Sequence, residues 1–297
     1  MKPYFELRRI RDFGEIISDT FTFFKENFKD LFKPMLIICS VFILLNLVTL
    51  FVMQRNAAEG VSAMANGTYN NDFDLPRWSI NAFISSFIYY FSYLFFNFSI
   101  FIITYSYIAV FKEKPEGEKP TLNEVWGYYR YYFLRAVGSS IVCTLLIGIG
   151  IVFCLLPGIY FGIVLCLVLP VIIFENASFG YAFNKSFTLI KGNWWLTFGV
   201  LIVLFLVLLV SSLIIIVPSA IIQQTQLLIN PEGWIWPVFI LLMLFYNLFL
   251  LSYSLVAIAI SMCYFSYSEQ KDGTGLIDRI NTLGMNDQSS HLPNEEF

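Results

Sequence analysis

Long runs without a single charged residue restrict the fold of this chain more than any other feature. One run extends from Ser79 to Phe111 and another from Ala136 to Phe174, which are 33 and 39 residues long. A helix of about 20 apolar residues crosses the hydrocarbon core of a bilayer, which is roughly 30 Å thick. Only 13% of the residues are charged, against about 25% in ordinary soluble domains. We therefore predict an integral membrane protein of the all-α class.

Six spans are predicted when these runs are counted. The run from Ala136 to Phe174 divides at Pro157-Gly158, because this dipeptide favours a turn. The predicted spans are residues 34–53, 79–111, 135–156, 159–174, 194–217 and 236–264. They form one polytopic membrane domain, residues 1–268, and we expect the polar tail, residues 269–297, to be largely disordered.

Positive charges are distributed very unevenly among the predicted connections. Of the 18 lysines and arginines, only Arg55 and Arg77 lie on one of the two sides. Because cytoplasmic segments are enriched in Lys and Arg, we predict a multi-pass protein of the cell (inner or cytoplasmic) membrane with both termini in the cytoplasm. We expect no signal peptide before the first span.

The tryptophans provide a separate argument for the same placement. An indole side chain is amphipathic and prefers the edge of a membrane. All six tryptophans fall at predicted membrane edges, and we interpret them as interface anchors: Trp78, Trp126, Trp194, Trp195, Trp234 and Trp236.

Three segments are too polar to cross a membrane but have apolar residues spaced as on one face of a helix. They are residues 12–32, 121–134 and 176–192. In the second, Thr121 and Glu124 have the spacing of a capping box, which starts a helix. We predict that all three are amphipathic helices in the cytoplasmic interface of the membrane.

Residues 12–32 and 178–198 also resemble each other. They are identical at seven of 21 positions with a constant offset of 166, including Phe13/Phe179 and Asn27/Asn193. The match favours an internal repeat in which an interfacial helix precedes a hairpin of two spans, with a degenerate middle copy. The alternative is a chance similarity between two helices rich in Phe and Lys.

Residues 156–199 carry a family resemblance. The run LPGIYFGIVLCLVLPVIIFENASFGYAFNKSFTLIKGNWWLTFG, which contains Glu175 and ends near Lys191-Gly192-Asn193-Trp194, resembles the membrane domain of some glycerophosphodiester phosphodiesterases and related uncharacterised bacterial six-span proteins. The resemblance implies a six-span helical domain. In the phosphodiesterases catalysis belongs to a separate barrel domain, which this sequence lacks, so we do not expect that activity here.

Few residues are suited to catalysis. His291 is the only histidine, and all five cysteines lie inside apolar runs. Metal sites that need several imidazole ligands therefore cannot form. We expect no enzyme, no cofactor and no metal site. A sequence pI near 5.3 also argues against a nucleic-acid partner, because phosphate binding requires a basic surface.

Four polar residues are the candidate site positions. Asn97 and Tyr105 lie in the second span and Asn247 in the sixth, where such side chains either connect helices by hydrogen bonds or line a polar cavity or lipid-headgroup site. Glu175 ends the fourth span. It is either a solvated acid near a helix N-terminus or the partner of a Lys or Arg that fixes the third interfacial helix.

Two functions are compatible with these observations. The first is a non-enzymatic accessory, scaffold or lipid-organising membrane component. Its partners would be membrane lipids together with a membrane protein or a second copy of the chain. The alternative is a transporter or permease for a small amphipathic or lipid-like solute, which a water-filled cavity lined by Asn97, Tyr105 and Asn247 would favour.

Overall fold

The computed structural model describes residues 5–65, 77–115, 118–229 and 235–273, and every regular element within these ranges is a helix. The elements are α1 (Phe13–Ala65), α2 (Arg77–Glu113), α3 (Leu122–Phe153), α4 (Leu155–Leu165), α5 (Val168–Phe174), α6 (Phe179–Ile190), α7 (Trp194–Ile229), α8 (Ile235–Leu250), the 3-10 turn η1 (Leu251–Tyr253) and α9 (Ser254–Asp272). Six helical stretches are long and apolar enough to cross a membrane, with α4 and α5 counted together and α8, η1 and α9 counted together. The predicted all-α membrane bundle is confirmed.

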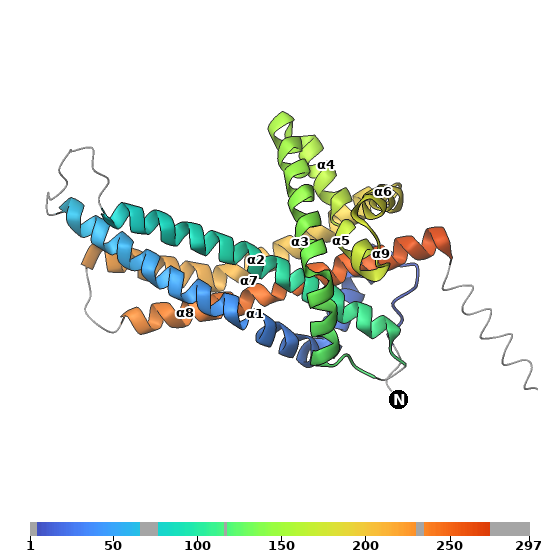
Figure 1. Cartoon of the computed structure of the whole chain (residues 1–297), viewed down its shortest axis with the longest axis horizontal. Helices are drawn as coiled ribbons and strands as arrows, with labels where there is room; N and C mark the ends of the chain where they lie inside the picture. Colours follow the sequence, from blue (N-terminus) through green and yellow to red (C-terminus); the bar gives the residue numbers. More distant parts are fainter. Residues whose placement is uncertain (1–4, 66–76, 116–117, 230–234, 274–297) are drawn as a thin grey trace, which may run out of the picture.

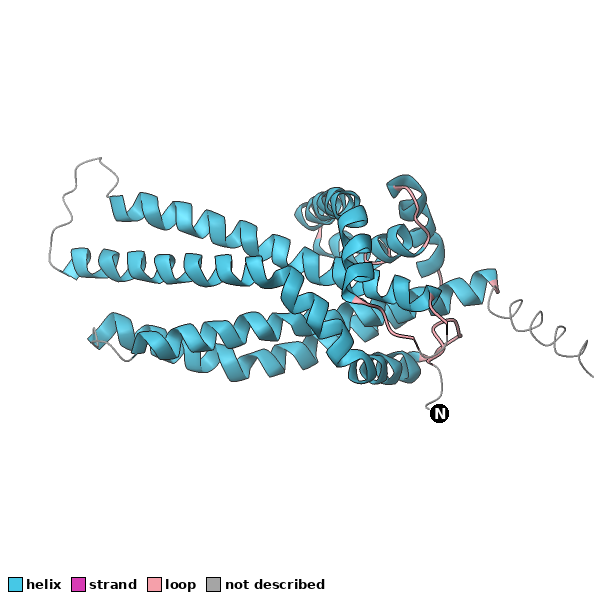
Figure 2. Ribbon diagram, turned by 60° about the horizontal axis from the view of Figure 1, so that its bottom comes forward, coloured by secondary structure: helices cyan, strands magenta, loops and turns pink. Residues whose placement is uncertain are grey.

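The helices form an elongated bundle with a lateral projection (Figure 1). Helices α1, α2, α7 and α8 lie side by side, and α9 continues from α8 toward the opposite end of the molecule. The hairpin of α3 and α4 projects steeply across this bundle. The N-terminal segment and the end of α9 lie at the same end (Figures 1 and 2), which we call the polar end.

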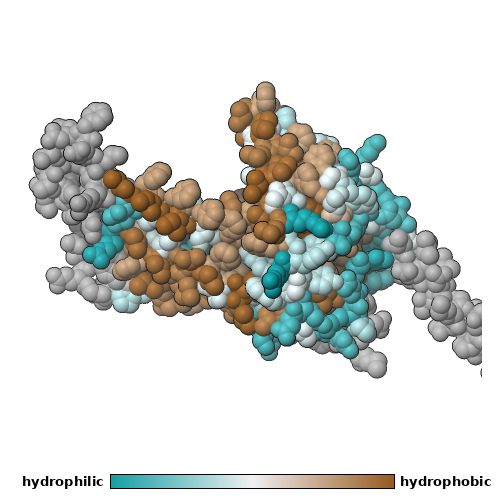
Figure 3. Space-filling model, in the orientation of Figure 1, coloured by the Kyte–Doolittle hydropathy of each residue, from teal (hydrophilic) through white to brown (hydrophobic). Residues whose placement is uncertain are grey.

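Hydropathy follows this shape. Apolar side chains cover the visible face of the long bundle and the projecting hairpin, whereas polar side chains gather at the polar end (Figure 3). Many large apolar side chains are exposed on the surface, among them Val152 and Phe153, which are 85% and 84% exposed. Apolar surface of this extent is typical of contact with lipid hydrocarbon.

Two of the three predicted interfacial helices are not separate helices. Residues 12–32 continue into the span 34–53 as α1, and residues 121–134 continue into 135–156 as α3. Pro34 lies inside α1 because a proline removes only one helical hydrogen bond and can bend a helix without ending it. Residues 176–192 do contain a separate helix, α6, which ends before Gly192 in a left-handed conformation (φ 90°).

Much of the apolar face of residues 12–32 is covered by protein. Ile16, Phe23 and Leu31 are 0–1% exposed. Phe23 packs edge-on against Phe5 and Phe111, with ring centroids 5.2 and 5.3 Å apart. This segment therefore packs against the rest of the protein, and only part of its apolar face remains for a membrane.

The boundary between the third and fourth spans also differs from the prediction. The turn lies at Cys154, and Pro157 occupies the first turn of α4, where the missing N–H of a proline costs little. The fourth span is further divided at Cys166 and Leu167 into α4 and α5. Pro170 cannot donate to the carbonyl of Cys166 four residues earlier, which explains the interruption.

The proposed repeat has some structural counterparts. Helices α1 and α6 begin at Phe13 and Phe179, which are aligned at the offset of 166. The aligned Thr20 and Ser186 are both fully buried, and each donates to the carbonyl oxygen four residues earlier. The copies then diverge, because α1 continues through Pro34 whereas α6 ends at Ile190. These features favour the repeat, which stays an interpretation.

Candidate functional site

Glu175 connects three helices at the polar end. It follows α5, and its Oε1 accepts a hydrogen bond of 2.5 Å from the hydroxyl of Tyr264 in α9. The same oxygen lies 2.9 Å from Nζ of Lys185 in α6. Lys185 is also 3.5 Å from Asp272 at the end of α9. The partner of Glu175 is thus a lysine, as the second interpretation of this residue required, and its effect on α6 is a prediction tested below.

The protonation of Lys185 depends on this cluster. Burial lowers the pKa of Lys185, but the hydrogen bond and negative charge of Glu175 outweigh burial, so that the pKa lies above its usual value. The lysine is therefore held in its charged form. Both side chains are only about one-fifth exposed (18% and 20%), so that solvent screens the ion pair less than it would screen a surface pair.

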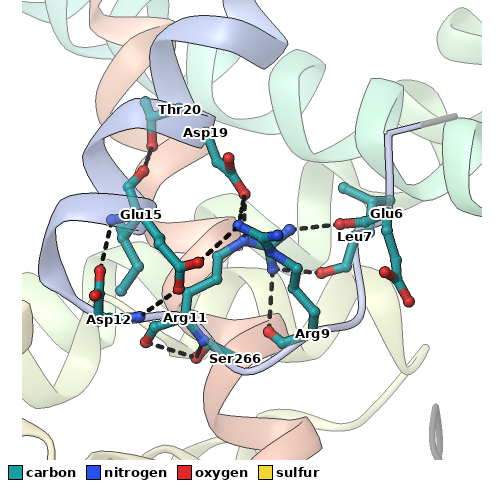
Figure 4. A network of polar contacts seen from close by, with 10 residues as sticks. Glu6, Leu7, Arg9, Arg11, Asp12, Glu15, Asp19, Thr20 and Ser266 are labelled. Carbon is teal, nitrogen blue, oxygen red and sulfur yellow. Dashed lines mark hydrogen bonds and ion pairs between the residues drawn. The ribbon is translucent and has the colours of Figure 1, made fainter. Parts of the chain in front are cut away.

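A second polar cluster fixes the N-terminal segment (Figure 4). The side chain of Arg11 is fully enclosed, and its Nε donates to Oδ2 of Asp19 at 2.7 Å. Three further N–H groups donate to backbone carbonyl oxygens of the preceding segment, those of Glu6, Leu7 and Arg9. The backbone N–H of Arg11 donates to Oγ of Ser266 in α9 at 3.0 Å.

The Arg11 cluster was not foreseen from the sequence. Burial lowers the pKa of Arg11, while the hydrogen bond to Asp19 raises it. Because the carbonyl groups and Asp19 occupy four of its five N–H donors and its side chain is enclosed, this guanidinium holds the N-terminal segment and is not available to a ligand. In the sequence Arg11 is one of several basic residues before the first helix, and nothing in the local pattern marks it as buried.

The other three candidate residues each have a different contact partner. Asn247 is buried and accepts from Nδ2 of Asn46 in α1 at 3.4 Å. Asn97 donates to the carbonyl of Tyr93 in its own helix at 2.8 Å. Tyr105 is 1% exposed and packs edge-on against Phe174, with centroids 6.0 Å apart. Such contacts fit the interpretation that these polar side chains connect neighbouring parts of the bundle, and the cavity of the transporter alternative stays a prediction.

Tyrosine hydroxyls supply interhelical contacts that the sequence analysis did not name. Tyr107 in α2 donates to Oδ1 of Asn27 at 3.1 Å. Tyr129 in α3 is 3.0 Å from Oγ of Ser99, and Tyr267 in α9 is 2.8 Å from Oγ1 of Thr197. All these groups are buried, so each bond compensates for the cost of removing two polar groups from water.

An open cleft of about 580 Å³ lies between the end of α2 and the beginning of α3. Its lining combines aromatic rings with charged side chains: Val110, Glu113, Lys114, Glu124, Gly127, Tyr128, Tyr131 and Tyr132. None of the four candidate residues lines it. The sequence feature that indicates this cleft is the tyrosine cluster at 128–132. It lies close to three charged residues around a short loop, Glu113 and Lys114 before it and Glu124 after it.

The charged groups of the cleft are held by specific contacts. The hydroxyl of Tyr128 donates to Oε2 of Glu113 at 2.5 Å. Nζ of Lys114 lies 3.0 Å from Oε2 of Glu124, and Glu124 also completes the predicted capping box with Thr121. The cleft therefore presents the oriented carboxylate of Glu113 beside the tyrosine rings of α3, with Lys114 close by.

The tryptophans predicted as interface anchors have different surroundings. Trp126 and Trp195 are 47% and 76% exposed. Trp194 packs nearly parallel to Tyr160 and Phe198, with ring centroids 6.1 and 5.2 Å away. The side chains of Trp78 and Trp236, and the whole of Trp234, lie outside the described part of the structure. Their role as anchors stays a prediction.

Among the described residues, no three His, Cys, Asp or Glu side chains come together in a way that could hold a metal ion. No protein-family model, curated protein or solved structure matches the chain. The resemblance of residues 156–199 to the membrane domain of glycerophosphodiester phosphodiesterases remains a hypothesis about its relatives.

Proposed function

We propose that this protein is a non-enzymatic component of the cell membrane that binds and organises lipid at its polar end, with both termini in the cytoplasm. The observation that carries the proposal is the cleft between α2 and α3. Its lining suits the headgroup of a phospholipid whose amine is positively charged.

The position of the cleft supports this function. The charge-free run of α2 ends just before Lys112, and Glu113 and Lys114 follow directly. The opposite wall is the amphipathic beginning of α3, which also exposes Trp126 and Tyr131. Aromatic side chains beside a change from apolar to charged sequence are typical of the headgroup region of a membrane.

The chemistry of the lining supports a zwitterionic ligand. An ammonium group is attracted both by a carboxylate and by the faces of aromatic rings, which Glu113 and Tyr128 supply together. A phosphate group is a favourable partner for Lys114. The cleft volume of about 580 Å³ also lies within the range of roughly 300–1,000 Å³ that small-ligand sites occupy.

The test is lipid binding to delipidated protein, measured by native mass spectrometry with phosphatidylethanolamine and phosphatidylglycerol. We expect phosphatidylethanolamine to bind more tightly, and Glu113→Gln to weaken it by about tenfold, which corresponds to about 1.4 kcal/mol. Glu118→Gln is the matched control, because Glu118 is exposed in the adjoining loop. Equal binding of the two lipids, or equal effects of the two variants, would contradict the proposal.

A further inference from the structure

We infer that the hairpin of α3 and α4 turns back inside the bilayer, so that it forms a wedge in the leaflet next to the polar end. Its partner is the hydrocarbon of the lipid acyl chains. The inference does not depend on the cleft, because it concerns the opposite half of α3.

The direction of the hairpin indicates that it does not cross the membrane. Helices α1, α2, α7 and α8 share one long axis, and the hairpin projects steeply across that axis near the boundary between the apolar bundle and the polar end (Figures 1 and 3). If the four long helices cross the membrane, a hairpin in this direction runs along the membrane and does not reach the far surface.

The composition of the tip is suited to hydrocarbon and not to water. A hairpin that crosses a membrane places its turn in water, but residues 145–159 around Cys154 include no charged, amide or hydroxyl side chain. Leu155 and Leu156 in the tip are 63% and 74% exposed. The sequence near the other two connections is polar. Gln54, Arg55 and Asn56 lie in the last part of α1, Gln223 and Gln224 lie near the end of α7, and Asn230 and Glu232 follow α7.

The backbone of the turn is also suited to hydrocarbon. A polar backbone group in hydrocarbon must be hydrogen-bonded within the protein. The N–H of Cys154 donates to the carbonyl of Gly150 at 3.0 Å, and its carbonyl accepts from the N–H of Gly158 at 3.4 Å. Pro157 has no N–H, which leaves one donor fewer to satisfy at the start of α4. A connection of one residue with both polar groups bonded is suited to an apolar environment.

The length of α4 agrees with this reading. Although α4 and α5 together have the length and composition of a span, α4 alone has 11 residues, which extend about 17 Å at 1.5 Å per residue. All described α5 residues except Leu169 are buried in the protein. Of α4 and α5, only α4 is left to face lipid, and it is too short to cross about 30 Å of hydrocarbon. Whether the hairpin crosses the membrane or turns back inside it, both of its ends lie on the same side of the membrane.

The tip contains its own probe, since Cys154 is exposed. The experiment uses the full chain in sealed proteoliposomes, with Cys39, Cys143, Cys166 and Cys263 replaced by alanine. A membrane-impermeant maleimide is applied to each face in turn. Two further proteins lack Cys154 and carry Ala57→Cys at the far end of α1 or Glu118→Cys at the polar end, as controls for the two aqueous faces.

We expect each control cysteine to react from one face, and Cys154 to react from neither until detergent is added. A fluorophore placed on Cys154 in detergent, followed by reconstitution, should then be quenched by phospholipids that carry a spin label in the acyl chain. Reaction of Cys154 from the same face as Ala57→Cys would overturn the inference, since the hairpin would then cross. Protection without quenching would also overturn it, because protein would then cover the tip.

A second test of the wedge needs no cysteine replacements. Leu156→Asp places a charge on an exposed side chain of the tip, and Ala57→Asp does so at the far end of α1. A charge in hydrocarbon is costly, so we expect the yield of membrane-inserted, folded protein to fall at least fivefold for Leu156→Asp only. Equal yields would contradict the wedge.

Discussion

Gly158 lies directly against Ile151 across the turn between α3 and α4. A Cβ atom built on Gly158 would be 2.3 Å from Cγ1 of Ile151 and 2.8 Å from its backbone nitrogen. A side chain at residue 158 would therefore have to displace backbone as well as a side chain. By contrast, a Cβ atom on Gly162, one turn further along α4, meets nothing within 4 Å. The spacing of these two glycines resembles a helix-contact motif, but only Gly158 lies in a close contact.

We predict that Gly158→Ala destabilises the protein by about 1–3 kcal/mol, the usual cost of forcing an extra carbon into a packed contact. Gly162→Ala should be neutral or stabilise by up to about 1 kcal/mol, because alanine favours the helix more than glycine. Thermal unfolding in detergent compares the two. An equal loss of stability in both variants would show that the close approach at Gly158 is unimportant.

Glu175→Gln should loosen α6. It removes the charge that Tyr264 and Lys185 share, which we expect to cost about 1–2 kcal/mol. Hydrogen exchange of residues 179–190 should increase, and Glu118→Gln should change neither property. Because the pKa of Lys185 lies above its usual value of 10.5, the difference between the wild type and Glu175→Gln should be full from neutral pH up to about pH 10.5 and decline as the pH rises further. If α6 exchanges equally in both proteins, Glu175 does not fix it.

Asn46 and Asn247 should behave as a pair. Asn247→Leu leaves the amide of Asn46 without its partner, and Oδ1 of Asn46 already has none. We expect a loss of about 0.6–1.7 kcal/mol, as found for buried polar contacts between membrane helices. The double variant Asn46→Leu/Asn247→Leu should recover most of that loss, because both polar groups are removed together. Additive losses in a double-mutant cycle would rule out the coupling.

Arg11→Lys should release the N-terminal segment. A lysine has three donors and no planar fork, so it cannot serve three carbonyl groups and Asp19 at once. We expect a loss of about 2–4 kcal/mol and faster hydrogen exchange in residues 5–12. The control is Arg130→Lys, since Arg130 is exposed on α3. Unchanged protection of residues 5–12 would show that the segment is held by its apolar contacts alone.

The helical class and the six apolar stretches could be predicted from the sequence because they depend on local composition. The continuity of the helix through Lys33-Pro34 in α1 and through Leu134-Arg135 in α3 could not be predicted. A polar and an apolar segment can share one continuous helix, and the backbone hydrogen bonds do not differ between them. Tertiary contacts such as Phe23 against Phe111 decide where such a helix is covered, and no local pattern contains them.

The candidate site was predictable only in part. The sequence suggested that Glu175 could have a basic partner, but the choice of Lys185 depends on how α6 packs against α5 and α9. The cleft is formed by residues close in sequence, and yet its shape depends on the angle between α2 and α3. Asn97, Tyr105 and Asn247 were grouped by polarity alone, and the packing of the helices gives each a different neighbour.

The contact between Arg11 and Ser266 also has a consequence for how the chain is made. These residues are 255 positions apart, and a ribosome adds about 5–20 residues per second. Arg11 must therefore wait roughly 10–50 s after its own synthesis before Ser266 in α9 is added. During that time α1 is present in the membrane without its contact to α9, and the polar end can close only after Ser266 has been added.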